Sequence, residues 1–189
     1  MQLYSLISVI IIILASTTVL EQVCAALDAT PFALIFCALC VLCLSGFVYA
    51  PYPELRINIA CAVLPICLLI MSGRETEHGI LLPAMVVIVM SGTACIAEKL
   101  LGAGTGLITG VISGLAALCL GGGMLSLFVV CSVPIITQLM NCAYELAQTG
   151  YTSCNMGSIY ILNAQMTALL VAMIIAVIKR IMIKRTSLI

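Results

Sequence analysis

Polar residues recur at helical spacing in one C-terminal stretch of an otherwise apolar chain, ITQLMNCAYELAQTGYTSCN, residues 136–155. Gln138, Asn141, Glu145 and Gln148 follow one another at steps of three, four and three, which places all four on one face of a helix. In hydrocarbon such groups are costly, about 2.5 to 3.5 kcal/mol for a central acidic residue, and they normally face a bundle interior or a wet cavity. The spacing therefore indicates a polar face directed into the protein.

A second polar face follows in the next apolar segment, where Asn163 and Thr167 lie four residues apart. Two facing polar stripes predict a binding site for a small solute. The alternative is that Glu145 and Gln148 lie at a solvated helix end, while Gln138 and Asn141 form hydrogen bonds between helices. The residues predicted to bind substrate are Gln138, Asn141, Glu145, Asn163 and Thr167.

Residue patterns for catalysis and metal binding are missing from the sequence. Cys37, Cys40 and Cys43 form a C-x-x-C-x-x-C run, a spacing that occurs in ferredoxin cluster ligation. Because this run lies in an apolar helix without a fourth ligand or a compensating charge, we interpret its cysteines as small packing residues. His78 and Glu75 make one E-x-x-H, whereas a di-iron bundle needs two. We predict no catalytic residues, no metal and no cofactor.

The composition indicates that a membrane surrounds the chain. Of its 189 residues, 64% are hydrophobic and 7% are charged, and the mean hydropathy is +1.33, whereas a soluble domain is about a quarter charged. At roughly 20 apolar residues per crossing, this length allows six or seven spans and no separate soluble domain. Seven basic and seven acidic residues give a net charge of zero, and without a basic tract the chain is not expected to bind nucleic acid.

Short polar clusters divide the apolar sequence into segments of membrane-spanning length. The predicted fold is all-α, a polytopic integral membrane helix bundle of about seven transmembrane helices, or six if one span is re-entrant. The N-terminal apolar segment lacks the basic residues that precede the core of a signal peptide, so we read it as a retained first span. Residues 1–189 form one transmembrane domain, with spans at about 3–20, 31–50, 57–72, 79–97, 100–120, 124–144 and 158–178.

Basic residues near span ends predict the orientation, because they are enriched in cytoplasmic loops. The only basic cluster follows the last span, so the C-terminus is expected in the cytoplasm and, with seven spans, the N-terminus outside. This cluster consists of Lys179, Arg180, Lys184 and Arg185.

Prolines and glycines inside the predicted spans indicate how the helices pack. Pro65 and Pro134 lie well inside predicted spans, where a proline frees a backbone carbonyl that neighbouring groups must satisfy. A stripe of glycines at four-residue spacing predicts close backbone contact with another helix, either within the chain or in a second copy. This glycine stripe consists of Gly102, Gly106, Gly110 and Gly114.

These features favour a transporter subunit or permease that binds or moves a small solute. In size and span number the chain resembles the substrate-binding membrane subunits of energy-coupling transporters, a likeness of architecture without a shared motif. One alternative is a non-catalytic structural or scaffold subunit of a larger membrane complex, and the least favoured is a membrane-embedded enzyme. The expected partners are the lipid bilayer and either further membrane subunits, an energising ATPase or other copies of the chain.

Overall fold

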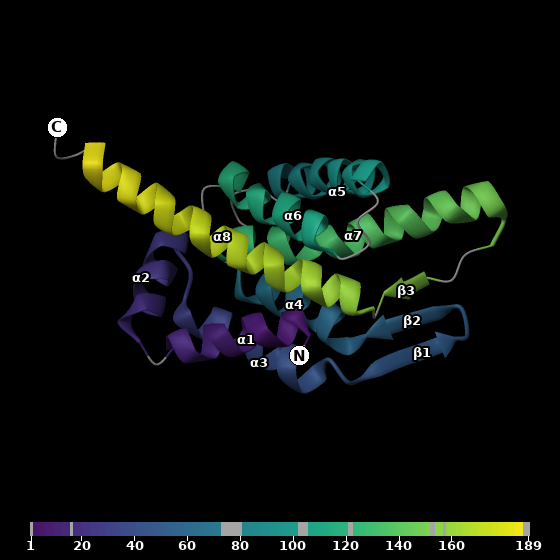
Figure 1. Cartoon of the computed structure of the whole chain (residues 1–189), viewed down its shortest axis with the longest axis horizontal. Helices are drawn as coiled ribbons and strands as arrows, with labels where there is room; N and C mark the ends of the chain where they lie inside the picture. Colours follow the sequence, from purple (N-terminus) through teal and green to yellow (C-terminus); the bar gives the residue numbers. More distant parts are fainter. Residues whose placement is uncertain are drawn as a thin grey trace.

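The computed structural model describes residues 2–15, 17–72, 81–101, 106–120, 123–151, 154–156 and 158–186. This part of the chain is mostly helical, as expected for an all-α protein, and a small sheet lies at one end (Figure 1). The helices are α1 (Leu3–Ala15), α2 (Thr18–Leu27), α3 (Pro31–Leu44), α4 (Ile59–Met71), α5 (Leu81–Leu101), α6 (Leu107–Leu120), α7 (Met124–Thr149) and α8 (Ile159–Thr186). The strands are β1 (Val48–Tyr52), β2 (Leu55–Asn58) and β3 (Cys154–Met156).

Three of the described helices are long and apolar enough to cross a membrane. They are α5 with 21 residues, α7 with 26 and the first 24 residues of α8. The helices α1 and α2 meet at 106° and would add a fourth crossing only if the bent pair is one span. The apolar helices α3, α4 and α6 have 13 or 14 residues, about 20 Å of helix against a hydrocarbon core of about 30 Å.

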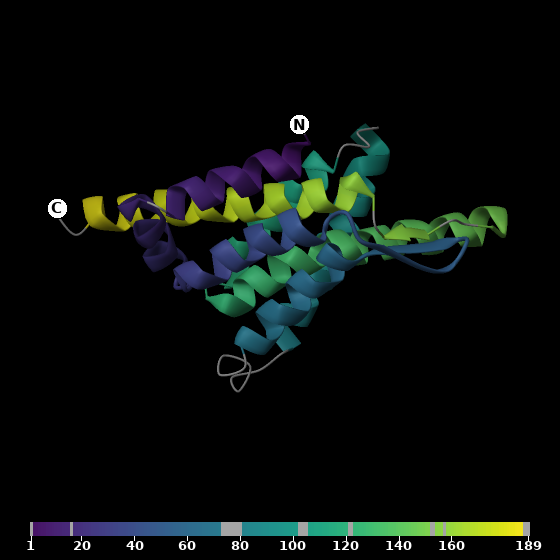
Figure 2. The same cartoon turned by 90° about the horizontal axis from the view of Figure 1, so that it is seen from below.

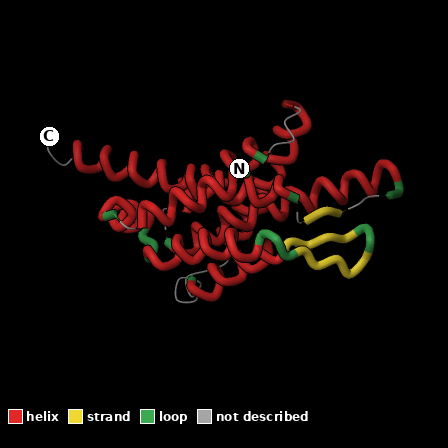
Figure 3. Tube along the Cα trace, turned by 60° about the horizontal axis from the view of Figure 1, so that its bottom comes forward, coloured by secondary structure: helices red, strands yellow, loops and turns green. Residues whose placement is uncertain are grey.

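The sheet was not predicted from the sequence. The span predicted at 31–50 is divided between α3, which ends at Leu44, and the first residues of strand β1. Pro51 lies in β1, one residue past the predicted span, and proline has no N–H for a helix ladder. Strand β1 pairs with β2 in antiparallel fashion, with Tyr49 opposite Ile57, and β3 adds to β2 in parallel. The three strands lie together beside the second half of α7, whose last turn projects past them (Figures 1 and 3).

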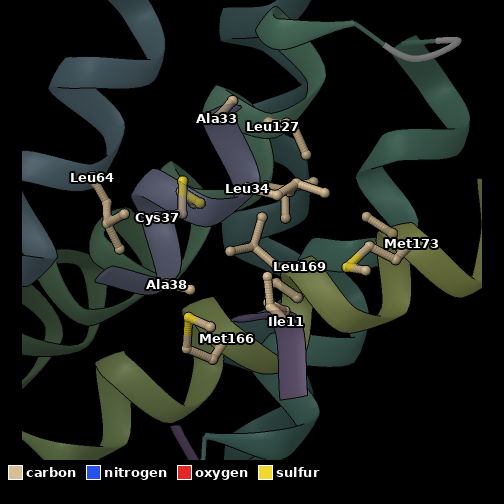
Figure 4. Packing of buried hydrophobic residues seen from close by; sticks show 14 of the residues in the cluster. Ile11, Ala33, Leu34, Cys37, Ala38, Leu64, Leu127, Met166, Leu169 and Met173 are labelled. Carbon is tan, nitrogen blue, oxygen red and sulfur yellow. The ribbon is translucent and has the colours of Figure 1, made fainter. Parts of the chain in front are cut away.

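Helix α8 runs through the middle of the bundle and contacts α1, α2, α4, α6 and α7. Figures 1 and 2 both show α1 alongside α8. The main core lies where α1, α3, α4, α7 and α8 meet, and Ile11, Leu34, Leu64, Leu127 and Leu169 point into it (Figure 4). The cysteine of α3 at position 37 is fully buried there as a free thiol, in a packing position.

One buried glutamine connects the two helices that contain internal prolines. Pro65 in α4 leaves the Cys61 carbonyl, four residues earlier, without a helical N–H. The Gln165 Nε2 atom of α8 donates to this carbonyl at 3.2 Å and to the Cys131 carbonyl of α7 at 3.0 Å, in the turn that precedes Pro134. Gln165 is completely buried. Its side chain therefore joins α4, α7 and α8 by hydrogen bonds to backbone groups.

The described glycines of the stripe lie against α8. A Cβ atom on Gly110 would lie 2.7 Å from Thr167 Cβ, and one on Gly114 would lie 2.6 Å from Val171 Cβ. Gly106 has a φ of +75° and lies against the Tyr160 carbonyl. Later glycines of α6 contact later residues of α8, so the two helices run in the same direction. The fourth glycine of the stripe, at position 102, is outside the described residues.

Candidate functional site

A cluster of polar side chains occupies the end of the bundle where α5 finishes and α6 and α8 begin. Glu98 lies one turn before the end of α5, Thr109 is in the first turn of α6 and Tyr160 is in the first turn of α8. Asn141, in the second half of α7, completes the cluster. The close approach of Gly106 to the Tyr160 backbone brings the first turns of α6 and α8 together. We call these four residues the Glu98 cluster.

Hydrogen bonds connect all four members. The hydroxyl groups of Thr109 and Tyr160 both donate to Glu98 Oε1, and their two oxygens lie 2.9 Å apart. Asn141 Nδ2 makes a long hydrogen bond of 3.4 Å to Glu98 Oε2, and its Oδ1 accepts from Cys95 Sγ at 2.9 Å. Side chains of three other helices therefore hold one carboxyl group of α5.

Glu98 is held by hydrogen-bond donors, and no cationic side chain pairs with its carboxyl group among the described residues. Thr109 is completely buried, while Glu98, Asn141 and Tyr160 are partly buried. The neighbouring Lys99 points elsewhere, since its Nζ atom lies 2.9 Å from the centre of the Tyr144 ring. An ionised Glu98 would thus depend on hydrogen-bond donors alone for its stabilisation.

The polar stripe predicted on α7 is only partly inside the bundle. Asn141 belongs to the Glu98 cluster, and Gln138 lies one turn earlier with its Nε2 atom 3.8 Å from Cys142 Sγ. Glu145 and Gln148 are exposed, on the last turns of α7 that extend past the other helices in Figure 1. The stripe therefore passes from the bundle interior to its outside.

The two residues predicted on α8 contact different helices. Asn163 Oδ1 accepts from the backbone N–H of Tyr4 at 3.1 Å, which satisfies one of the free N–H groups in the first turn of α1. Thr167 packs against Gly110, and its buried hydroxyl has no hydrogen-bond partner in the described part of the chain. Of the five residues predicted to bind substrate, the structure thus brings Asn141 into the Glu98 cluster. The substrate-binding role of the set stays a prediction.

Sequence reasoning missed Glu98, Thr109 and Tyr160 as a group. Glu98 stands next to Lys99, between the spans predicted at 79–97 and 100–120, and no other carboxylate is near it in the sequence. The one available signal was the carboxylate itself, because an ionisable residue inside a membrane segment is a candidate functional residue. Its partners are 11, 43 and 62 residues away in sequence, too far for any spacing rule to connect them.

An apolar groove of about 350 Å³ lies elsewhere, between α4, α5 and α7. Pro83 and Val87 of α5 and Phe128 of α7 are among its lining residues, with Ser132 as a polar member. This lining suits an acyl chain or an apolar side chain better than a polar solute.

Neither metal-site geometry nor relatives add to this description. Within the described residues, no group of three or more His, Cys, Asp or Glu side chains could hold a metal ion. In comparisons with known proteins, no family model, no curated protein and no solved structure matches the chain.

Proposed function

We propose that the protein is a multi-pass membrane protein that binds and moves a small solute, either as a permease or as the membrane subunit of a transporter. The observation that carries this proposal is the Glu98 carboxyl group, held by side chains of α6, α7 and α8 within an apolar bundle. Ionisable groups inside membranes are costly and mark pathways for ions, protons or charged solutes. Because Glu98 has no cationic partner among the described residues, the site suits a cationic group.

The proposed topology has seven crossings, the first formed by the bent pair of α1 and α2 and the others by α3, α4, α5, α6, α7 and α8, of which α3, α4 and α6 are shorter than the hydrocarbon core. Its support is the placement of the chain ends, since Tyr4 near the start of α1 contacts Asn163 near the start of α8. The C-terminal end of α8 lies at the other end of the bundle, where Arg180 donates to the Gln22 carbonyl of α2. With exposed Lys179 and Arg180 on the cytoplasmic side, the Glu98 cluster belongs to the outer half of the membrane.

The second candidate function is that of a structural subunit in a larger membrane complex. Its support is the exposure of α5, because only 17% of the most apolar stretch of this helix is buried within the protein. Leu82, Met85, Val89 and Ile96 are large apolar residues on α5 with more than half of their surface exposed. In a complex, this face of α5 would pack against partner subunits instead of lipid.

Uptake by reconstituted vesicles tests the first proposal. The purified chain is placed in lipid vesicles, alone or with co-purifying subunits, and a panel of small cationic solutes is screened for uptake. Glu98→Gln is expected to abolish the uptake, while Glu21→Gln makes the same chemical change at an exposed carboxylate of α2 and should leave uptake unchanged. Loss of uptake in Glu145→Gln but not in Glu98→Gln would instead support the predicted α7 stripe as the site.

A further inference from the structure

We propose that a groove between α2 and α8 binds an anionic phospholipid, with its phosphate group on Arg180 and part of an acyl chain in the groove. Helix α2 packs beside the C-terminal half of α8 (Figure 1). The groove between them has a volume of about 330 Å³, within the range of about 300 to 1,000 Å³ that is typical of ligand sites. We call it the α2–α8 groove, and its lining residues are Val19, Gln22, Val23, Val177, Arg180 and Ile181.

The lining of the α2–α8 groove combines an aliphatic wall with one cationic side chain. Four of the six lining residues are valine or isoleucine. Val19 and Ile181 are about half exposed, at 47% and 52%, so their side chains are open to the surroundings of the protein. Aliphatic walls suit a hydrocarbon chain, whereas a guanidinium group suits an anion. A molecule with both parts, such as an anionic phospholipid, matches the whole lining.

Arg180 is held at the groove by a backbone contact that leaves its charge uncompensated. Its Nη1 atom donates to the Gln22 carbonyl of α2 at 2.8 Å. A guanidinium group has five N–H donors in a planar fork that matches the oxygens of a phosphate, so donors remain for an anion. Within the described residues Arg180 forms no ion pair, although the exposed Glu21 stands next to Gln22. An anionic group can therefore bind without displacing a carboxylate.

Further basic residues of α8 make this end of the helix a favourable place for an anionic lipid. Lys179 is exposed and borders a smaller hollow where α2 meets α6 and α8. Lys184 and Arg185 follow within the same helix. The acidic residues of α2 and its C-cap are Glu21 and Asp28, so basic residues outnumber acidic ones here. The charge at this end of the bundle therefore complements a phosphate group.

The length of α8 places Arg180 at the level of lipid headgroups. From Ile159 to Arg180 the helix rises about 32 Å, against a hydrocarbon core of about 30 Å, and its apolar stretch ends at Met182. In the proposed topology this end faces the cytoplasm, where the leaflet is rich in anionic lipids and basic pockets between helices bind their headgroups. The inference uses this topology but does not require that the protein transports a solute.

Lipid titration of the purified full chain in detergent, followed by native mass spectrometry, tests the proposal. Phosphatidylglycerol should bind on the order of ten-fold more tightly than phosphatidylcholine with the same acyl chains. Arg180→Gln should weaken phosphatidylglycerol binding about five-fold, the effect of one basic side chain at a membrane surface. Arg56→Gln makes the same change at an exposed arginine of β2, away from the groove, and should leave the affinity unchanged.

A second variant tests the groove itself, because Arg180→Gln also removes a bond between α8 and α2. Val19→Trp fills the groove without a change of charge and should weaken phosphatidylglycerol binding, while Val48→Trp, at a similarly exposed valine of β1, should not. Circular dichroism and the elution profile establish that each variant is folded.

Three results would overturn the inference. They are equal affinity for the two lipids, unchanged phosphatidylglycerol binding in Arg180→Gln or in Val19→Trp, and displacement of the lipid by an equal concentration of glycerol phosphate, which would indicate a site for small anions. Vesicle uptake is measured separately, so its absence would remove the transport proposal and leave the lipid site standing.

Discussion

Replacement of Gln165 by leucine tests whether one side chain of α8 supports both proline-containing helices. Gln165→Leu keeps the approximate volume of a completely buried residue but removes the donors to the Cys61 and Cys131 carbonyls. Interhelical hydrogen bonds in membrane bundles contribute about 0.6 to 2 kcal/mol each. The Gln165 Oε1 atom is buried without a partner in the described part of the chain, and its removal returns about 1 kcal/mol. We expect a net loss of about 2 kcal/mol in the free energy of unfolding.

A double-mutant cycle with Pro65→Ala identifies the cause of that loss. Alanine restores the N–H at position 65, which can bond to the Cys61 carbonyl in the ordinary helical pattern. In this background Gln165→Leu should cost about 1 kcal/mol less than in the wild type, because one of its two acceptors has another donor. Equilibrium unfolding in mixed detergent micelles measures each variant.

The exposed Gln148 provides the matched control, since its amide donates to the Tyr144 hydroxyl one turn away on the same helix. Gln148→Leu should stay within about 0.5 kcal/mol of the wild type, as ordinary surface substitutions do. An equally small effect of Gln165→Leu, or the same cost with and without Pro65, would refute the role assigned to Gln165.

Three further predictions concern packing and topology. Gly110→Ala should destabilise the bundle by about 1 to 3 kcal/mol, because its Cβ would lie 2.7 Å from Thr167 Cβ. Gly92→Ala, with no atom within 4 Å of the added Cβ, should be neutral or gain up to about 1 kcal/mol of helix propensity. Equal effects of the two substitutions in unfolding experiments would contradict the close contact of α6 with α8. Asn163→Leu should cost about 1 kcal/mol and accelerate hydrogen exchange at the Tyr4 amide, and unchanged exchange would show that this bond does not hold α1. Reporter fusions should place the C-terminus in the cytoplasm and the N-terminus outside, and two cytoplasmic ends would replace seven spans by an even number.

The sequence predicts the helical character of the chain better than the contacts between its helices. Apolar runs placed the centres of α4, α5, α7 and α8 within the predicted spans, because hydrophobic length is a local property. The strand β1 was missed since Tyr49 to Pro53 was divided between a span and a loop. Its pairing with β2 depends on partners that no periodicity indicates.

The candidate site shows the same limit. Spacing alone identified Asn141 on the inner part of the α7 stripe. The site around Glu98 forms only after α6 packs on α8 and brings Thr109 beside Tyr160. The alignment of α6 against α8 follows from close contacts at Gly106 and the next glycines of the stripe. The sequence shows the spacing of these glycines but not the helix that they contact.

Labelling with a membrane-permeant carbodiimide, localised by mass spectrometry, is the most direct test of the central claim that Glu98 forms a solute site within the bundle. A membrane-permeant carbodiimide can reach carboxyl groups inside the bundle, so we expect an adduct at Glu98, slower labelling in the presence of a transported cationic solute, and no adduct at position 98 in Glu98→Gln. Adducts only at exposed carboxylates such as Glu21 and Glu54, or labelling of Glu98 that no solute slows, would contradict the account.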